Sequence, residues 1–293
     1  MNGVINVLKP PGMTSHDVVS YLRRELGVKR IGHAGTLDPQ AAGVLPVCVG
    51  QATRLVEYLV GASKEYFCQA TFGLTTTTQD AWGDVVEQRE TGDLDLAEIS
   101  AAVDSFRGEI TQITPKYSAV KKNGVPLYKL ARQGIETPSI TRQVLINDIK
   151  VIAFKAPVLS LLVECSKGTY IRTLCHDLGQ KLACGAHMSF LLRTRVGDFK
   201  LDDSLTVEEI SELKEKSLLP MEYCVREMPK LTLAREDIRR LRFGQAIRTN
   251  KHENMMESIA AVFDEAERLQ AIVEVMDCGQ KYCLKPKKVI NME

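Results

Sequence analysis

The sequence GHAGTLDPQAAGVLPV, residues 32–47, is the stretch around which the rest of the chain is organised. Its three glycines and two prolines disfavour one regular element, because glycine permits positive φ, while proline fixes φ and lacks an N–H group. The stretch therefore predicts a shaped loop that leads into a buried strand at residues 44–49. Asp38 lies in the middle of this loop, before a proline that restricts it to extended backbone.

Two interpretations of Asp38 remain open from the loop alone. A rigid loop that presents one carboxylate at the edge of an apolar sheet suits a nucleophile or a general base. Alternatively, Asp38 forms an Asx-turn, in which its side chain only caps the neighbouring backbone. Taken by itself, the loop slightly favours the Asx-turn.

The length and composition are those of a soluble globular protein with two domains, or one large domain with an appendage. The chain has 293 residues, of which 44% are hydrophobic, and no apolar run approaches the roughly 18 residues that span a membrane. The N-terminus begins directly as a strand and lacks the features of a signal peptide. We therefore expect a cytoplasmic protein with no membrane association.

Eight cysteines and five histidines give no indication of a metal site. The cysteines are scattered and lie mostly within apolar runs, which predicts buried thiols rather than disulfides in a cytosolic chain. Cys278 and Cys283 are the closest pair, but no second pair stands at metal-binding spacing and the histidines form no metal motif. We therefore expect neither a metal ion nor another cofactor.

The net charge of +1 argues against a protein that coats RNA over its whole surface, but the charges are unevenly distributed. Residues 80–110 contain nine acids and two bases, whereas residues 114–142 contain six bases and one acid. A polyanion would be attracted to the second segment and repelled by the first. The second segment also contains Tyr117 and Tyr128, and cations interleaved with aromatic rings suit single-stranded or loop RNA. Two ordinary solvated faces are the alternative interpretation.

Hydrophobic periodicity and turn residues predict mixed helices and strands up to about residue 228, followed by a small β-rich part. The predicted strands cover residues 3–8, 64–73, 144–154 and 158–165, with another that ends near residue 197. The predicted helices run from Thr14 or Ser15 to Gly27, over 52–59, from Asp95 to Phe106, over 127–133, and from Ser166 to Leu182. Residues 75–83 are expected to form a polar loop. From Pro229 onward the pattern predicts short strands and one basic helix, Arg235–Arg242.

The helix expected after Ser166 raises one electrostatic problem. Arg172 falls in its first turn or two, where the helix dipole disfavours a cation, so we expect an anionic partner for this side chain. Cys175, His176 and Asp177 follow and look like a catalytic trio. Adjacent residues of a helix point in different directions, so these three are not expected to act together.

Five separated stretches of the chain resemble the TruB-type tRNA pseudouridine synthases. They are residues 32–47, the strand start at Lys64-Glu65-Tyr66, residues 115–134, residues 165–172, and the segment from Gly185 to Thr194. The resemblance covers nearly all of residues 1–200 in the right order, and the ordered set is highly specific. The similarity of the C-terminal part to a PUA-type RNA-binding domain is much weaker and rests on pattern.

This resemblance implies an α+β protein with the pseudouridine synthase fold: a large mixed, mainly antiparallel central sheet flanked by helices and loops, plus a small C-terminal β-rich PUA-like domain. The implied catalytic domain covers residues 1–228, with residues 114–142 as a basic RNA-contacting insertion. Residues 229–293 would form the PUA-like RNA-binding domain. The implied reaction is isomerisation of the T-loop uridine of tRNA, position 55 in tRNA numbering, to pseudouridine. The nucleotide must be flipped out, and an aspartate can attack C1′ of the ribose or C6 of the base without a metal.

The same resemblance implies roles for individual residues. Asp38 matches the essential acid of the family, Tyr66 the aromatic residue that stacks on the target base, and Arg172 the basic residue that pairs with the acid. His33 matches a residue that fills the space left by the flipped base, and Leu191 an apolar residue that lines the pocket. Further contacts with RNA or substrate are expected from Lys64, Asp80, Lys121, Lys122 and Arg132.

Two rival functions fit parts of this pattern. The guide-RNA-dependent branch of the same superfamily works in a multi-protein particle, but the bacterial-like length, the lack of a lysine-rich tail and the basic insertion favour a stand-alone enzyme. A non-catalytic RNA-binding or RNA-folding protein would use the same basic surfaces but has no need of Asp38. The expected partner is therefore the T-arm of tRNA, bound by a monomer with no obligate protein partner. One departure from the family pattern is Trp82, which stands where a small or acidic residue is expected.

Overall fold

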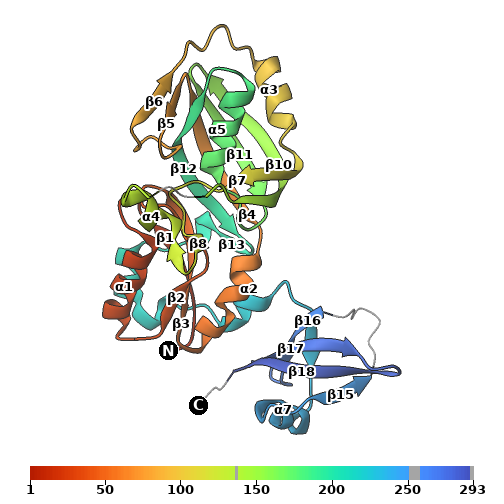
Figure 1. The fold of residues 1–293 in the computed structure, drawn as a ribbon. Helices are drawn as coiled ribbons and strands as arrows, with labels where there is room; N and C mark the ends of the chain where they lie inside the picture. The colour runs from red at the N-terminus through yellow and green to blue at the C-terminus, as the bar shows by residue number, and fades with distance from the viewer. Residues whose placement is uncertain (136–137, 251–257, 291–293) are drawn as a thin grey trace.

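The computed structural model describes residues 1–135, 138–250 and 258–290, whose strands form two main sheets (Figure 1). The larger sheet has nine strands, and its main path runs β1-β3-β12-β4-β11-β10-β7. At its side, β2 pairs with β3 and β13 pairs with β12. The strands of this sheet are β1 (Gly3–Lys9), β2 (Ile31–His33), β3 (Ala42–Val49), β4 (Lys64–Phe72), β7 (Gly108–Ile113), β10 (Thr141–Lys155), β11 (Val158–Cys165), β12 (Ala186–Val196) and β13 (Phe199–Lys200).

The larger sheet is mixed and mainly antiparallel, as predicted. β12 pairs with β3 in parallel, and the other pairs run antiparallel. β4 lies between β11 and β12 and has the alternating pattern of a strand whose two faces differ, with Tyr66, Cys68, Ala70 and Phe72 buried on one face. Helix α5 (Ile171–Lys181) packs against β4 and β12, so this face of the sheet carries the main hydrophobic core.

Helix α1 (Ser15–Leu26) follows β1 and begins at a capping box. Thr14 is the N-cap: its hydroxyl accepts from the Asp17 N–H, and the Asp17 carboxylate accepts from the Thr14 N–H. Gly27 ends the helix in the left-handed region with φ of 65°. The apolar face of α1 packs with β1 and β3 in a second buried cluster, so both ends of the helix lie where the sequence predicts them.

The start of α5 differs from the sequence-based prediction. The helix begins at Ile171 with Tyr170 as its N-cap, and Ser166 does not cap it. Instead the Ser166 hydroxyl accepts from the Leu145 N–H on β10, at 2.9 Å, and Gly168 with φ of 83° separates Ser166 from the helix. Arg172 is therefore the second helical residue.

The remaining predicted helices of the first 228 residues are present but shorter or divided. The predicted helix at 52–59 is a 3-10 turn, η1 (Gly50–Leu55), followed by α2 (Val56–Gly61). The Thr-rich segment predicted as a loop contributes to a hairpin of β5 (Leu74–Thr76) with β6 (Val85–Gln88). The other elements are α3 (Leu96–Asp104), β8 (Lys121–Lys122), β9 (Val125–Pro126), α4 (Leu127–Arg132), η2 (Leu201–Asp203), α6 (Val207–Leu213), η3 (Lys214–Ser217) and η4 (Met221–Val225).

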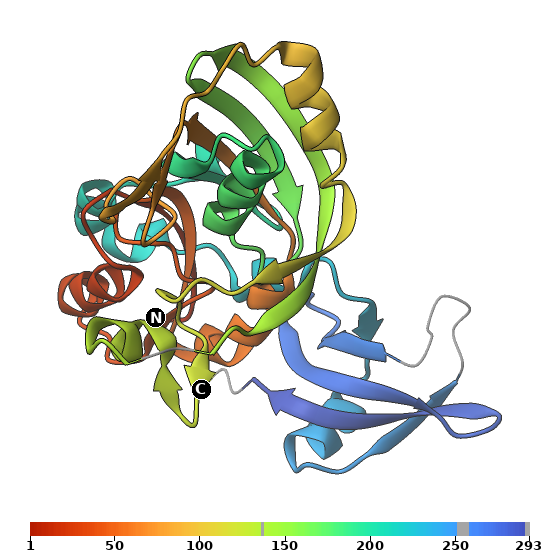
Figure 2. The same ribbon diagram turned by 45° about the horizontal axis from the view of Figure 1, so that its top comes forward.

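The C-terminal part forms a five-stranded sheet in the order β14-β16-β17-β18-β15, drawn in blue beside the larger sheet (Figures 1 and 2). This β half-barrel confirms the prediction of a small β-rich C-terminal region in an α+β protein. Its elements are β14 (Lys230–Thr232), α7 (Arg235–Arg242), β15 (Ile247–Asn250), β16 (Ser258–Phe263), β17 (Leu269–Asp277) and β18 (Lys281–Val289).

One buried cluster spans both sheets. It includes Val44 and Leu55 from the N-terminal part together with Phe263, Leu269 and Ile272 from the C-terminal sheet. Because apolar burial is a main source of stability, removing the C-terminal strands would expose part of this cluster to water. The division into domains at residues 1–228 and 229–293 therefore remains a prediction, with a buried contact between the two parts.

The cysteines follow their prediction only in part. Six are buried, namely Cys48, Cys68, Cys165, Cys175, Cys184 and Cys224, whereas Cys278 is exposed and Cys283 is partly buried. Among the described residues, no cluster of three or more His, Cys, Asp or Glu side chains is placed to hold a metal ion. No helix in the described ranges is long and apolar enough to cross a membrane.

Candidate active site

The loop that carries Asp38 connects β2 to β3 and is held by side chains from other segments. The Ser15 hydroxyl accepts from the Leu37 N–H at 2.9 Å and donates to the Leu37 carbonyl oxygen at 3.2 Å. On the other side of Asp38, Lys9 Nζ donates to the Pro39 carbonyl oxygen at 3.0 Å. The backbone on both sides of the carboxylate is thus fixed, as the glycine and proline content of the loop indicates.

Arg193 on β12 closes the same loop from the core. Its Nε donates to the Val44 carbonyl oxygen at 2.7 Å, and its Nη2 donates to the Gly35 carbonyl oxygen at 3.0 Å, so it bridges the two ends of the loop. Arg193 is buried, with only 1% of its surface exposed. Gly43, with φ of 114°, allows the Arg193 backbone to approach β3: an added Cβ would lie 2.2 Å from the Arg193 carbonyl oxygen.

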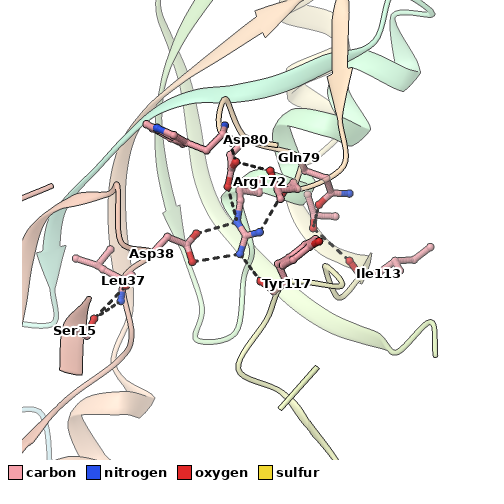
Figure 3. Close-up of polar contacts among 11 residues, drawn as sticks. Ser15, Leu37, Asp38, Gln79, Asp80, Ile113, Tyr117 and Arg172 are labelled. Atoms are coloured by element: carbon pink, nitrogen blue, oxygen red, sulfur yellow. Dashed lines mark hydrogen bonds and ion pairs between the residues drawn. The ribbon is translucent and has the colours of Figure 1, made fainter. Parts of the chain in front are cut away.

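The Asp38 carboxylate faces Arg172 in a two-point ion pair (Figure 3). Arg172 Nε lies 2.9 Å from one carboxylate oxygen, and Nη2 donates to the other at 3.3 Å. The Arg172 side chain is 5% exposed, whereas that of Asp38 is 38% exposed. Asp38 is therefore the anionic partner predicted for Arg172. Arg172 binds both carboxylate oxygens, and the exposed part of the Asp38 side chain remains accessible to a ligand.

Three further groups complete the surroundings of the Arg172 guanidinium. Its Nη2 donates to the Tyr117 carbonyl oxygen at 2.9 Å, and its Nη1 donates to the Thr78 carbonyl oxygen at 3.1 Å. Asp80 Oδ2 lies 3.9 Å from Nε, and its side chain is 15% exposed. The site thus joins the loop of Asp38, the Thr-rich turn, the basic segment that begins at residue 114, and α5.

An apolar cluster includes Leu37, the residue before Asp38. Leu37, Tyr66 and Leu191 belong to the same buried cluster, from the loop, β4 and β12 respectively. Tyr66 and Leu191 are 9% and 8% exposed. Burial raises the pKa of the Tyr66 phenol, so the hydroxyl is protonated at neutral pH. The loop that presents the Asp38 carboxylate is thus anchored in the apolar cluster through Leu37.

His33, at the end of β2, is partly buried beside the loop. Burial, followed by the charge of Arg193, lowers the pKa of His33, so its ring is neutral at pH 7. The buried Nδ1 atom has no hydrogen-bond partner among the described residues. The structure therefore places His33 next to Asp38's loop without assigning its ring to another polar contact.

Lys64 is not placed as the sequence predicts for a group that contacts RNA. It is 6% exposed, and its Nζ donates to the carbonyl oxygens of Val60 and Ala62 at 2.7 Å and 2.6 Å. Burial lowers its pKa to about 8. The Lys64 ammonium binds carbonyl groups at the end of α2. Because the side chain is buried there, its position gives no support to the predicted contact with RNA.

The three other predicted contact residues lie on the surface of the basic insertion. Lys121 and Lys122 form the exposed strand β8, and Arg132 is exposed at the end of α4. The Arg132 guanidinium lies 5.7 Å from the centre of the Tyr128 ring. Tyr117, near the start of the same segment, reaches the site, because its carbonyl oxygen accepts from Arg172. Cys175, by contrast, is buried in the core, so the trio at 175–177 forms no site.

Sequence reasoning missed two buried cations, Lys9 and Arg193. Lys9 is fully buried, and besides Pro39 its Nζ donates to the carbonyl oxygens of Pro10 and Met13 at 2.8 Å and 2.6 Å. Burial lowers the pKa of Lys9 to about 8. The available signal was a cation at the end of an apolar strand, since such a residue needs a specific partner when buried.

Two family models match the chain. The model of the TruB family pseudouridylate synthase N-terminal domain matches residues 23–171, and that of the tRNA pseudouridylate synthase B C-terminal domain matches residues 172–226. The chain is 46% identical over 290 residues to tRNA pseudouridine synthase B of Alkaliphilus oremlandii, covering 96% of each chain. It is 43% identical over 296 residues to tRNA pseudouridine synthase B of Carboxydothermus hydrogenoformans, covering 99% of each.

Solved structures give the same answer for the fold. A chain of the Cbf5-Nop10-Gar1 complex matches with a TM-score of 0.80 and 29% identity, covering 99% of this chain and 85% of that one. A chain of an H/ACA RNP bound to a substrate RNA containing 2′-deoxyuridine matches with a TM-score of 0.77 and 27% identity, with the same two coverages. On the strength of the family models and these full-length relatives, the chain belongs to the TruB family and is a tRNA pseudouridine synthase, an isomerase.

Proposed function

We propose that this enzyme converts the T-loop uridine of tRNA, position 55, to pseudouridine, with Asp38 as the nucleophile. The observation that carries the proposal is the Asp38 carboxylate, which a two-point ion pair with Arg172 orients at the edge of an apolar cluster. Oriented carboxylates form covalent intermediates without a metal. A pure RNA-binding protein has no use for such a pair.

The proposed reaction is balanced within one nucleotide. The C1′–N1 bond of the uridine breaks, a C1′–C5 bond forms, C5 loses its hydrogen to solvent and N1 gains one. The target must first leave the T-loop stack, and the flipped uracil would lie against Tyr66 and Leu191. Asp38 attacks C1′ or C6, and both positions are compatible with its exposed carboxylate. Arg172 favours the ionised form of its partner because the two carry opposite charges.

The remaining site residues have supporting roles in this proposal. His33 would occupy the space left in the T-loop, because its buried Nδ1 atom has no hydrogen-bond partner in the part of the chain that the structure describes. Asp80 would help to position the Arg172 guanidinium, from which its carboxylate is 3.9 Å away. Lys121, Lys122 and Arg132 would contact phosphates of the T-arm.

We further propose a stand-alone monomer rather than a component of a guide-RNA particle. Relatives called tRNA pseudouridine synthase B are 43–48% identical to this chain, whereas the chain of the Cbf5-Nop10-Gar1 complex is 29% identical. Purified protein should therefore release the C5 hydrogen of the target uridine from an unmodified tRNA transcript without guide RNA or a second protein. A requirement for either component would contradict the stand-alone assignment. Turnover of tRNA that lacks the T-loop uridine would contradict the substrate position.

The basic insertion gives a test of RNA binding that is separate from catalysis. Lys121→Ala combined with Lys122→Ala should weaken tRNA binding and lower the slope of log affinity against log salt by about 1 to 2, because each lost phosphate contact releases about one counterion fewer. Fluorescence anisotropy at several salt concentrations measures both quantities. The exposed lysines Lys181 and Lys216 lie on α5 and η3, and their double Ala variant is the control. An unchanged salt slope in the β8 variant would place the RNA elsewhere.

The C-terminal part contains a second basic surface. A groove of about 710 Å³ runs along α7 and includes Arg235, Arg239, Arg242 and Arg268, together with the acids Asp264 and Glu265. Deleting residues 229–293 would uncover the buried cluster that spans both sheets, so point substitutions are the better test. We propose that this groove binds tRNA beyond the T-arm and takes no part in the chemistry.

Arg235→Ala combined with Arg239→Ala should raise the Kd for full-length tRNA several-fold, by roughly 3- to 10-fold for two phosphate contacts. Turnover of an isolated T-arm stem-loop at saturation should stay unchanged, because the groove does not touch the reacting atoms. Arg240→Ala is the matched control: Arg240 is on the same helix, pairs with Asp237 and does not line the groove. Equal affinities of the double variant and the control for full-length tRNA would refute the binding role.

A further inference from the structure

The only tryptophan of the chain, Trp82, is exposed to solvent in the turn between β5 and β6. It is 56% exposed, and the nearby Val85 and Val86 on β6 are 61% and 64% exposed. Large aromatic side chains contribute most to stability when they are buried, so a tryptophan left in water gains little for the fold. Exposed apolar groups of this size typically mark a binding surface.

The turn that carries Trp82 is rigid. The Thr77 N–H donates to the Asp84 carbonyl oxygen at 2.9 Å, and the Asp84 N–H donates to Thr77 Oγ1 at 3.1 Å. Gly83 packs so closely that an added Cβ would lie 2.3 Å from Thr78 Oγ1. The Ala81 N–H donates to the Met188 carbonyl oxygen at 3.0 Å, which ties the turn to β12. The backbone of Trp82 is therefore positioned before any ligand arrives.

The same turn is part of the candidate active site. Asp80 Oδ1 accepts from the Trp82 N–H at 3.1 Å and from Thr78 Oγ1 at 2.5 Å, while its Oδ2 faces Arg172. Figure 3 shows Asp80 beside the guanidinium that holds Asp38. Trp82 therefore stands at the rim of the site, one hydrogen bond away from its charged network.

The charges around Trp82 indicate whether a phosphate or a nucleobase of the RNA would bind there. Asp84 is exposed, and Glu87 is paired with Arg89, so the turn presents no free cation for a phosphate. A nucleobase is neutral and flat, and stacks on an aromatic ring without requiring a cation. Because a flipped uridine leaves its neighbours partly unstacked, an unpaired base lies near the rim when the site is occupied.

We propose that Trp82 stacks on an unpaired nucleobase of tRNA next to the flipped uridine. This inference rests on the proposed function, since it takes the RNA to occupy the site of Asp38. Trp82 contributes binding and register of the substrate, and it does not contact the reacting atoms. Trp82→Ala should therefore weaken tRNA binding by about tenfold or more while leaving turnover at saturation nearly unchanged.

The single tryptophan makes a direct measurement possible. Binding is measured with the Asp38→Asn variant, which keeps the RNA unreacted, and an unmodified T-arm stem-loop as the probe. Trp82 emission should change on RNA binding and become shielded from acrylamide. In the same assay, Trp82→Phe should retain most of the affinity because it keeps a ring, and Trp82→Ala should lose about tenfold or more. All variants should melt at the parent temperature, which separates a binding role from a structural one.

An abasic nucleotide identifies the partner base. A set of T-arm stem-loops is prepared, each with one abasic site at a different T-loop position beside the target. The affinity of each stem-loop is measured for the Asp38→Asn protein with and without the Trp82→Ala change. At the stacked position the penalty of the Ala change should disappear, since both members of the pair are then absent. The inference would be overturned if the wild-type enzyme turns over an RNA whose binding changes neither the emission of Trp82 nor its quenching by acrylamide. Emission that depends on protein concentration instead of RNA would assign the patch to a second copy of the chain and overturn it as well. If the wild-type enzyme forms no pseudouridine at all, the proposed function fails, whatever Trp82 reports.

Discussion

Replacing Asp38 with Asn should abolish pseudouridine formation, lowering the rate by at least about 10⁴-fold, while tRNA binding stays within about twofold of the parent enzyme. The amide has nearly the shape of the carboxylate but is a poor nucleophile. The fold should survive because the loop is held through its backbone, by Ser15, Lys9 and Arg193, and not through the Asp38 side chain. Arg172 also keeps its bonds to the carbonyl oxygens of Thr78 and Tyr117.

The measurement is release of the C5 hydrogen from saturating tRNA in a single turnover, next to a binding titration of the same RNA. Asp84→Asn is the matched control, because it also removes one acid from the region but affects an exposed residue that does not contact Arg172. The control should react at the parent rate. Substantial turnover by Asp38→Asn would remove Asp38 from the mechanism, and lost binding would show that the change damages the site as a whole.

The sequence was informative where the relevant physics is local. Glycine and proline restrict φ within the loop itself, so the shaped loop and the strand after it follow from residues 32–47 alone. The first turn of a helix disfavours a cation, and this local conflict at Arg172 predicted an anion that the structure identifies as Asp38. Helix caps are equally local, and Thr14, one of the two N-caps that the sequence predicts, caps α1 in the structure.

The sequence was uninformative where partners are distant along the chain. Arg193 donates to the carbonyl oxygen of Val44, which is 149 residues away in the sequence. No local sequence pattern predicts a backbone acceptor at that separation. Ser166 was predicted to cap a helix, but its hydroxyl accepts from Leu145, 21 residues away on a neighbouring strand. The Lys64 ammonium binds carbonyl oxygens at the end of α2, a contact that the sequence does not indicate, and its contact with RNA stays a prediction. Each of these outcomes depends on sheet packing, which periodicity does not specify.

Arg172→Lys is the second change expected to have a large effect, with single-turnover rates reduced by about 10²-fold or more. The guanidinium uses its planar array of donors to bind both oxygens of Asp38 and two carbonyl oxygens at once. A lysine ammonium is a point charge on a different stem and cannot match this geometry. It would preserve the charge but leave the carboxylate free to rotate, and small errors in placement of a nucleophile are costly.

The loss should appear mainly in the rate at saturation, since Arg172 is 5% exposed and does not offer a surface for tRNA phosphates. Stability should also fall, because the carbonyl oxygens of Thr78 and Tyr117 lose donors, at a cost of about 1–3 kcal/mol for each buried acceptor left unsatisfied. The control is Arg195→Lys. Arg195 lies on β12 of the larger sheet and forms another Arg–carboxylate pair, with Glu164 at 3.0 Å. Both variants are compared by thermal melting and by rates measured well below the melting temperature. Parent-like rates for Arg172→Lys would show that charge alone is sufficient, and that the two-point geometry at Asp38 does not govern the reaction.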